Sequence, residues 1–243
     1  MRKLILVMFL VPIMMMGQEN ESKILSLTHV KVKLGHEAQF FEGMKMYKKC
    51  YGENGGEDGW NAWRRVQGKN MVVAVSSMMD NWAAMDDDND EASNKCRNLF
   101  NGFIMPHVDG YESSFARTMP NISNDSDNNK DKVWVTYFRV NNSTKFMDVI
   151  KTVSGAVKES EGDERAYWYG FSGGGPSSAD YMVVWPFEKY ADLDKDQEGV
   201  WELCEKKHGK KKTEELRETF RNSLDDSWAF MYDKSDELSF AKE

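Results

Sequence analysis

One stretch of this chain occurs twice, and the repetition is the strongest constraint on its fold. Residues 60–82 read WNAWRRVQGKNMVVAVSSMMDNW, and residues 168–190 read WYGFSGGGPSSADYMVVWPFEKY. Each copy shows an aromatic strand, a polar turn with glycine, an apolar strand and a helix start that carries an aromatic residue. The copies are 108 residues apart, so the sequence predicts two structural units with one plan.

The flanking residues extend each copy to the order β-α-β-β-α-β, the ferredoxin-like split βαβ unit. In the first copy we expect strands at 23–33, 60–66, 71–77 and 108–115, with helices ending near residue 50 and spanning 90–105. In the second copy we expect strands at 133–140, 165–171, 180–185 and 227–232, with helices at 143–157, 197–206 and 216–224. A Lys-rich segment at 205–215 has no counterpart in the first copy.

The predicted fold class is α+β, with two tandem ferredoxin-like repeats packed sheet to sheet within one chain. Each four-stranded sheet buries one face under its helices, while its other face is still rich in apolar and aromatic residues. Two such faces would cover each other. The expected divisions are 1–17 signal peptide, 18–117 first repeat, 118–132 linker with almost nothing to bury, 133–232 second repeat and 233–243 tail.

The first residues have the pattern of a secretory signal peptide. Arg2 and Lys3 precede the apolar run 4–16, which is too short to span a bilayer comfortably. We expect cleavage after Gly17 and a secreted or periplasmic protein with no membrane contact afterwards. An uncleaved N-terminal anchor is the alternative. Loss of the two cations would change the formal net charge from −8 to −10, and an acidic surface argues against a nucleic-acid partner.

The three cysteines, Cys50, Cys96 and Cys204, are an odd number, so at least one thiol is unpaired within the chain. Cys96 and Cys204 are 108 residues apart and occupy equivalent places in the two copies, so a bridge between them is not expected. The prediction is three buried or half-buried thiols.

The segment 30–40, VKVKLGHEAQF, resembles a known family. A strand, a glycine, an acidic residue and a phenylalanine that opens the helix are the usual entry of domains in the dimeric α+β barrel superfamily, in particular its antibiotic-biosynthesis-monooxygenase and NIPSNAP-like branches. The second copy departs from this entry, with Asn141 and Asn142 in place of Gly35 and His36. The resemblance implies the fold rather than one activity, since members include cofactor-free oxygenases, haem enzymes and proteins without known chemistry.

Strand alternation identifies candidate ligand-binding residues, because every second residue would face the space between the sheets. The uniformly apolar Val30, Val32, Phe138 and Val140 are expected to face the helices. The opposite face then carries His29, Lys31, Tyr137 and Arg139. The hairpins add Trp63, Arg65, Tyr167 and Tyr169, or, in the other phase, Trp60, Arg64 and Trp168. Such a lining would suit a flat or anionic small molecule, although the same residues could be core aromatics and solvated strand ends.

Signals for other chemistry are weaker. None of the four histidines forms a metal-spaced pair, so no metal site is predicted. Haem enzymes of the superfamily use a proximal histidine, and His208, in the added segment of the second copy, is the candidate; a solvated basic loop is the alternative. Residues 170–174, GFSGG, match a nucleophile elbow in letters only, because a strand rather than a helix follows.

Three functions remain open. The leading hypothesis is non-catalytic or weakly catalytic binding of a small organic molecule between the sheets, without a cofactor. The second is a cofactor-free or haem-dependent oxidoreductase of the monooxygenase type. The third is a module whose outer helices bind partner proteins. The oligomeric state is not predicted.

Overall fold

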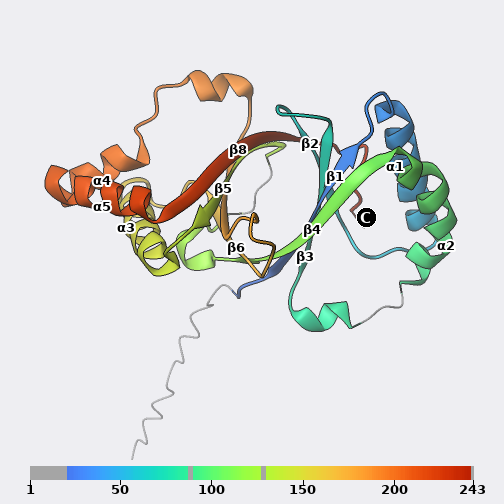
Figure 1. Cartoon of the computed structure of the whole chain (residues 1–243), viewed down its shortest axis with the longest axis horizontal. Helices are drawn as coiled ribbons and strands as arrows, with labels where there is room; N and C mark the ends of the chain where they lie inside the picture. The colour runs from blue at the N-terminus through green and yellow to red at the C-terminus, as the bar shows by residue number, and fades with distance from the viewer. Residues whose placement is uncertain (1–20, 87–89, 127–129, 242–243) are drawn as a thin grey trace, which may run out of the picture.

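The computed structural model describes residues 21–86, 90–126 and 130–241, and it shows a β-barrel with helices on two opposite sides (Figure 1). The strands are β1 (Ile24–Val32), β2 (Asn61–Arg65), β3 (Val72–Met79), β4 (Val108–Thr118), β5 (Lys132–Val140), β6 (Tyr167–Phe171), β7 (Tyr181–Phe187) and β8 (Leu224–Lys234). The α-helices are α1 (Glu37–Glu53), α2 (Glu91–Leu99), α3 (Ser143–Glu161), α4 (Val200–His208) and α5 (Lys210–Asn222). Short helical turns are η1 (Trp82–Met85), η2 (Phe100–Ile104), η3 (Met105–His107), η4 (Pro120–Ile122) and η5 (Tyr190–Asp194).

The strands form one closed antiparallel barrel in the order β1-β3-β2-β8-β5-β7-β6-β4. Both halves of the chain have the same internal order, β4-β1-β3-β2 in the first and β8-β5-β7-β6 in the second. Pairing of β2 with β8 and of β4 with β6 joins the halves. The expected sheet-to-sheet packing therefore takes the form of a closed barrel, which leaves no sheet edge unpaired.

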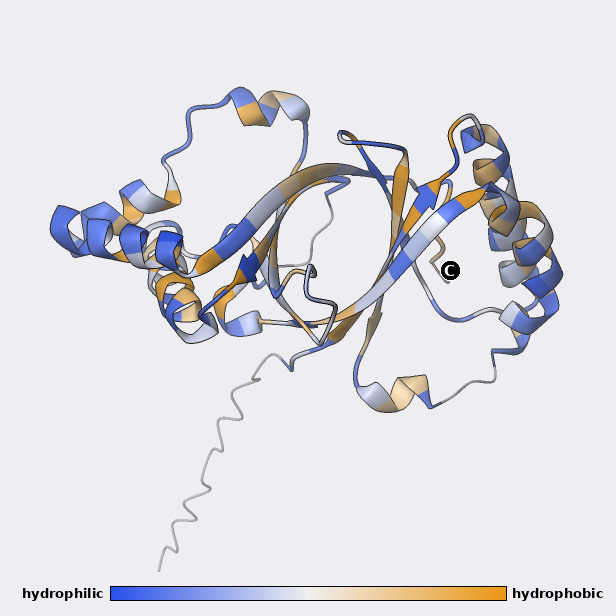
Figure 2. Cartoon of the chain, viewed as in Figure 1, coloured by the Kyte–Doolittle hydropathy of each residue, from blue (hydrophilic) through white to orange (hydrophobic). Residues whose placement is uncertain are grey.

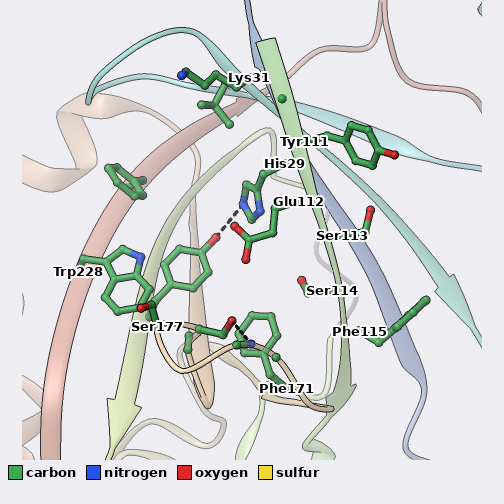
Figure 3. A pocket seen from close by; sticks show the side chains of 18 of the residues that line it. His29, Lys31, Tyr111, Glu112, Ser113, Ser114, Phe115, Phe171, Ser177 and Trp228 are labelled. Atoms are coloured by element: carbon green, nitrogen blue, oxygen red, sulfur yellow. Dashed lines mark hydrogen bonds between the residues drawn. The ribbon is translucent and has the colours of Figure 1, made fainter. Parts of the chain in front are cut away.

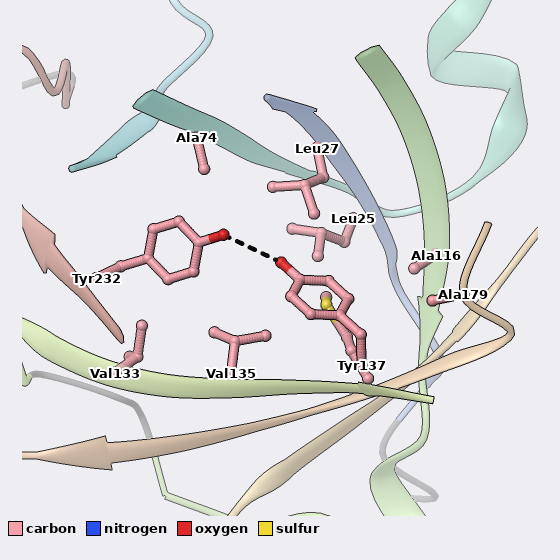
Figure 4. Packing of buried hydrophobic residues seen from close by; sticks show 10 residues of the cluster. Leu25, Leu27, Ala74, Ala116, Val133, Val135, Tyr137, Ala179 and Tyr232 are labelled. Carbon is pink, nitrogen blue, oxygen red and sulfur yellow. Dashed lines mark hydrogen bonds between the residues drawn. The ribbon is translucent and has the colours of Figure 1, made fainter. Parts of the chain in front are cut away.

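Alternation along the strands separates two kinds of core, as the sequence predicts. Leu25 and Leu27 of β1 face the barrel interior together with Val133 and Val135 of β5 (Figure 4). The opposite faces pack under the helices. Val30 and Val32 lie in the cluster around Phe40 of α1, and Phe138 and Val140 lie in the cluster around Phe146 of α3. In Figure 2 the ribbons of α4 and α5 are coloured mainly hydrophilic.

Two segments outside the predicted repeats, the linker and the tail, are packed against the fold. In the linker 118–132, β4 runs on to Thr118 and β5 begins at Lys132, while Ile122 is 5% exposed within the Phe138 and Phe146 cluster. In the tail, Leu238 is 1% exposed and packs in the first half, against the Phe40 cluster. The expectation that the linker has almost nothing to bury was wrong, because a single apolar side chain in a polar stretch is enough to anchor it.

The expectation of three thiols was wrong for two of them. Cys50 of α1 and Cys96 of α2 form a disulfide with a Cα–Cα distance of 6.0 Å, and Cys204 is a buried free thiol. The sequence argument considered pairing between the copies, whereas the bond joins two neighbouring helices within one copy.

The predicted signal peptide, 1–17, lies outside the described residues. Within the described ranges, no helix has both the length and the apolar content needed to cross a bilayer.

Candidate ligand-binding site in the barrel

A cavity of about 600 Å³ occupies one end of the barrel interior (Figure 3). Its walls come from β1, β4, β5 and β8, from the adjoining ends of β2 and β3, and from the Ser- and Gly-rich loop that follows β6. Deeper in the barrel the apolar cluster of Figure 4 leaves a space of only about 110 Å³. The barrel is thus filled over much of its length and hollow where the polar residues lie.

Three polar side chains form the floor of this cavity. Tyr137 and Tyr232 place their hydroxyls 3.3 Å and 3.4 Å from Nε2 of His29, and 3.5 Å from each other. Burial, with a contribution from the nearby Arg65 charge, lowers the pKa of His29 from 6.5 to about 4. Burial also raises the pKa of Tyr137 and of Tyr232. The floor is therefore hydrogen-bonded and uncharged at neutral pH.

Arg65, at the end of β2, brings a positive charge to the wall. Its Nη2 donates to the backbone carbonyl oxygens of Lys69 and Asn70, and its guanidinium lies 4.5 Å from the centre of the Phe230 ring. No described carboxylate lies within 4 Å of it. At the rim, Lys31 forms an ion pair with Asp109.

The structure brings four of the eight candidate residues to the cavity lining: His29, Lys31, Arg65 and Tyr137. Trp63 and Tyr169 also face the barrel interior, but in the filled part, where Trp63 Nε1 donates to Ser76 Oγ at 3.0 Å. Burial there raises the pKa of Tyr169 to about 12.

The other two candidates, Arg139 and Tyr167, lie outside the lining. Arg139 lies near the end of β5, 3.9 Å from Asp226 of β8, and does not line the cavity. The Tyr167 hydroxyl donates to Ser126 O at 2.6 Å. Residues of the other phase face the helices: Trp168 packs on Phe138, Trp60 on Phe240, and Arg64 lies over Phe41.

Sequence reasoning missed a large part of the lining, contributed by β8. Trp228, Phe230 and Tyr232 all line the cavity, and Trp228 stacks on Tyr137 with ring centroids 5.7 Å apart. The alternation in SWAFMY could have identified them, because three aromatic residues recur at every second position. Glu112 of β4 and the loop residues 172–178 were also missed.

Two further cavities lie outside the barrel, between its outer surface and the helices. One, of about 500 Å³, is lined by Val30, Val75 and Met44, and the other, of about 460 Å³, by Phe138, Val183 and Ile150, among others. Both linings are largely apolar. The cations of the second cavity, Arg165 and Lys195, are paired with Glu161 and Asp192.

No protein-family model and no curated protein sequence matches this chain, but solved structures match nearly all of it. A provisionally assigned monooxygenase from Fusobacterium nucleatum has a TM-score of 0.52 at 12% identity, covering 92% of this chain and 100% of that chain. A chlorite dismutase variant from Candidatus Nitrospira defluvii, complexed with cyanide, has a TM-score of 0.53 at 8% identity, covering 90% and 93%. An anthrone oxidase-like protein has a TM-score of 0.52 at 8% identity, covering 89% and 92%.

The chain has the dimeric α+β barrel fold. This confirms the fold that the resemblance of residues 30–40 implies. At such low identities the likeness shows the fold alone, so the choice between the monooxygenase and NIPSNAP-like branches stays a prediction.

The haem expectation depends on a proximal histidine, which would have to face the cavity that holds the porphyrin. His208 lines neither the barrel cavity nor the two helix-side cavities. His29 does line the barrel cavity, but its Nε2 faces the hydroxyls of Tyr137 and Tyr232. The described residues do not fit haem bound through either histidine.

Proposed function

We propose that the barrel cavity binds a small, planar organic molecule. The observation that carries this proposal is the gathering of an uncharged His–Tyr–Tyr floor, aromatic walls and an arginine around an open space of about 600 Å³. Cavities of this size with a few convergent polar groups are typical of small-molecule sites, and aromatic walls favour flat ligands through stacking.

We infer that binding, rather than proton-transfer catalysis, is the main role of this site. His29 is the natural candidate for a general base, but a pKa of about 4 makes it a weak one. A general base is most effective when its pKa lies near the working pH, and this one lies about three units below neutrality. The geometry therefore supports non-catalytic or weakly catalytic binding.

A cofactor-free oxygenase is the second candidate function. It is supported by the fold shared with provisionally assigned monooxygenases and by two residues of the cavity. The neutral imidazole of His29 could accept a proton from an acidic C–H group of the substrate, and the cationic Arg65 could hold the resulting anion. Oxygen uptake by the purified protein with an anthrone as substrate tests it. Oxygen uptake by the wild type that is lost in His29→Gln would establish the oxygenase. If the wild type takes up no oxygen, ligand binding is the only proposed function that remains.

The proposal extends to the chain as a whole. The shared strand order of the two halves supports an origin as duplicated ferredoxin-like repeats. Residues 1–17 support export to the periplasm or beyond. A role of the outer helices in binding partner proteins stays a hypothesis.

Native mass spectrometry of the purified protein tests the binding proposal, with 2-naphthol titration as a second probe. We expect Tyr137→Phe to weaken binding of the retained molecule or of 2-naphthol about threefold to tenfold, because it removes one hydroxyl of the floor. Tyr167→Phe removes a hydroxyl outside the lining and is the matched control. A barrel that retains no small molecule and takes up no 2-naphthol would contradict the proposal.

A further inference from the structure

We propose that the ligand enters the barrel as an anion, an aromatic or conjugated acid whose oxyanion lies on the guanidinium of Arg65. This inference rests on the proposed function and adds the chemical class of the ligand to it. The argument depends on which charges at the cavity are compensated by the protein and which are not.

Arg65 is a cation in the cavity wall without a protein anion beside it. Among the described residues no acidic side chain lies within 4 Å of its nitrogens, whereas Lys31 at the same cavity is paired with Asp109. Arg65 lines the same cavity as His29, Tyr137 and Tyr232, so its charge acts on the floor of that cavity. A half-buried charge is stabilised by pairing, and among the described residues no carboxylate supplies it, so an anionic ligand would complete this site.

The hydrogen bonding of the cavity floor differs from that of Arg65. The two tyrosine hydroxyl protons have acceptors within the group, since one hydroxyl can donate to His29 Nε2 and the other to its tyrosine neighbour. The protons of the floor therefore need no ligand, while its hydroxyl oxygens keep lone pairs that can accept a hydrogen bond from one. The strongest interaction available to an incoming molecule is therefore a charge-assisted hydrogen bond from Arg65.

Arg65 is also held in place for this role. Gly68, in the β2–β3 turn, has φ = +107°, and a Cβ there would lie 3.1 Å from the Phe230 ring and 3.3 Å from the guanidinium. The turn thus lies close against both the guanidinium and Phe230, and the backbone carbonyls of Lys69 and Asn70 accept from Nη2. A cation fixed by stacking and two carbonyls loses little freedom when it binds an oxyanion.

Glu112 sets the direction of the ligand. Its carboxylate points into the cavity beside His29 from β4, which is separated from β2 by β1 and β3 in the barrel (Figure 3). An acidic group is repelled on that side and attracted on the Arg65 side. The site should therefore take a ligand with one acidic end and an aromatic body, and discriminate against dicarboxylates that would reach Glu112.

A matched pair of probes tests the inference on the wild-type protein. 2-Naphthoate and 2-naphthamide have the same shape and differ in charge, and their binding is measured by titration calorimetry at low and high salt. We expect naphthoate to bind at least about tenfold more tightly than naphthamide, and this preference to shrink as salt is raised. Equal binding of the two probes would overturn the inference while leaving the proposed function standing. Binding of neither would contradict the proposed function itself.

Variants assign the preference to one side chain. Arg65→Met should bind both probes equally weakly, and Arg65→Lys should keep only part of the preference, since an ammonium cannot reproduce the planar fork. Arg139→Met makes the same charge change outside the lining and should leave the preference intact. If Arg65→Met retains the wild-type preference, or Arg139→Met abolishes it, the anion does not lie on Arg65. Circular dichroism confirms that each variant is folded, and the wild-type comparison holds whether or not they are.

Discussion

At the scale of single residues, the buried imidazole of His29 links stability to pH. Its pKa falls from 6.5 to about 4 in the folded protein, so between these values the unfolded chain binds the proton and the folded protein does not. The stabilisation is present above pH 6.5 and is lost as the pH falls toward 4. A shift of this size corresponds to about 3 kcal/mol at most. We expect the wild type to lose more stability than His29→Gln over this window, because glutamine keeps an acceptor but does not titrate.

Urea unfolding at pH 7, 5.5 and 4.5 measures this difference. The contribution of all other titrating groups is common to both proteins and cancels in the comparison. His36→Gln is the matched control, because it removes a histidine whose ring lies outside the cavity lining and contacts His107 at 2.9 Å. Parallel pH profiles for wild type and His29→Gln would show that the folded protein does not hold this imidazole neutral.

The sequence predicts part of this site because strand alternation is a strict geometric rule. It places His29 and Tyr137 on one face and Val30 and Phe138 on the other, and the structure agrees. The rule does not say how far along a strand the cavity extends, so it could not predict that Arg139, near the end of β5, lies outside the lining. It gives no distances between strands, so the contact of Tyr232 with His29, 203 residues apart in the chain, could not be predicted.

At the scale of elements, the C-terminal segment after β8 shows what local patterns leave out. Residues 235–243 have no periodicity, yet Phe240 exchanges backbone hydrogen bonds with Trp60 and stacks on its ring. Leu238 enters the core formed by β1, β3 and α1. Hairpins are predictable because their signals are contiguous, whereas the docking of this segment depends on a pocket built by residues far away in sequence.

The burial of Leu238 leads to a prediction for this segment. Leu238 is 1% exposed, so Leu238→Ala leaves a cavity beneath α1 and should lower the free energy of unfolding by about 2–5 kcal/mol. Leu34 is the control, because it is 89% exposed; the same substitution there, Leu34→Ala, should alter the free energy of unfolding by less than about 0.5 kcal/mol. Thermal and urea unfolding measure both. Equal effects in the two variants would mean that the segment after β8 is not part of the folded core.

At the scale of the whole molecule, barrel closure makes the two halves one cooperative unit. The interior cluster takes Leu25, Leu27 and Ala74 from the first half and Val133, Val135 and Met182 from the second. Neither half can bury these residues alone, and the seams β2–β8 and β4–β6 supply the backbone partners of each edge strand. Local opening of one half should therefore expose the other.

A pair of equivalent substitutions tests this coupling. Phe40 and Phe146 stand at matching places in α1 and α3, and both are 0% exposed. Phe40→Leu should destabilise the first half by about 1 kcal/mol, and hydrogen exchange should then accelerate as much in β5 and β7 as in β1 and β3. Phe146→Leu should produce the same pattern from the other side. Because the barrel interior contains side chains from both halves, protection in β5 and β7 that survives Phe40→Leu unchanged would mean that the halves open independently, and a cavity shared between them could then not be a stable binding site.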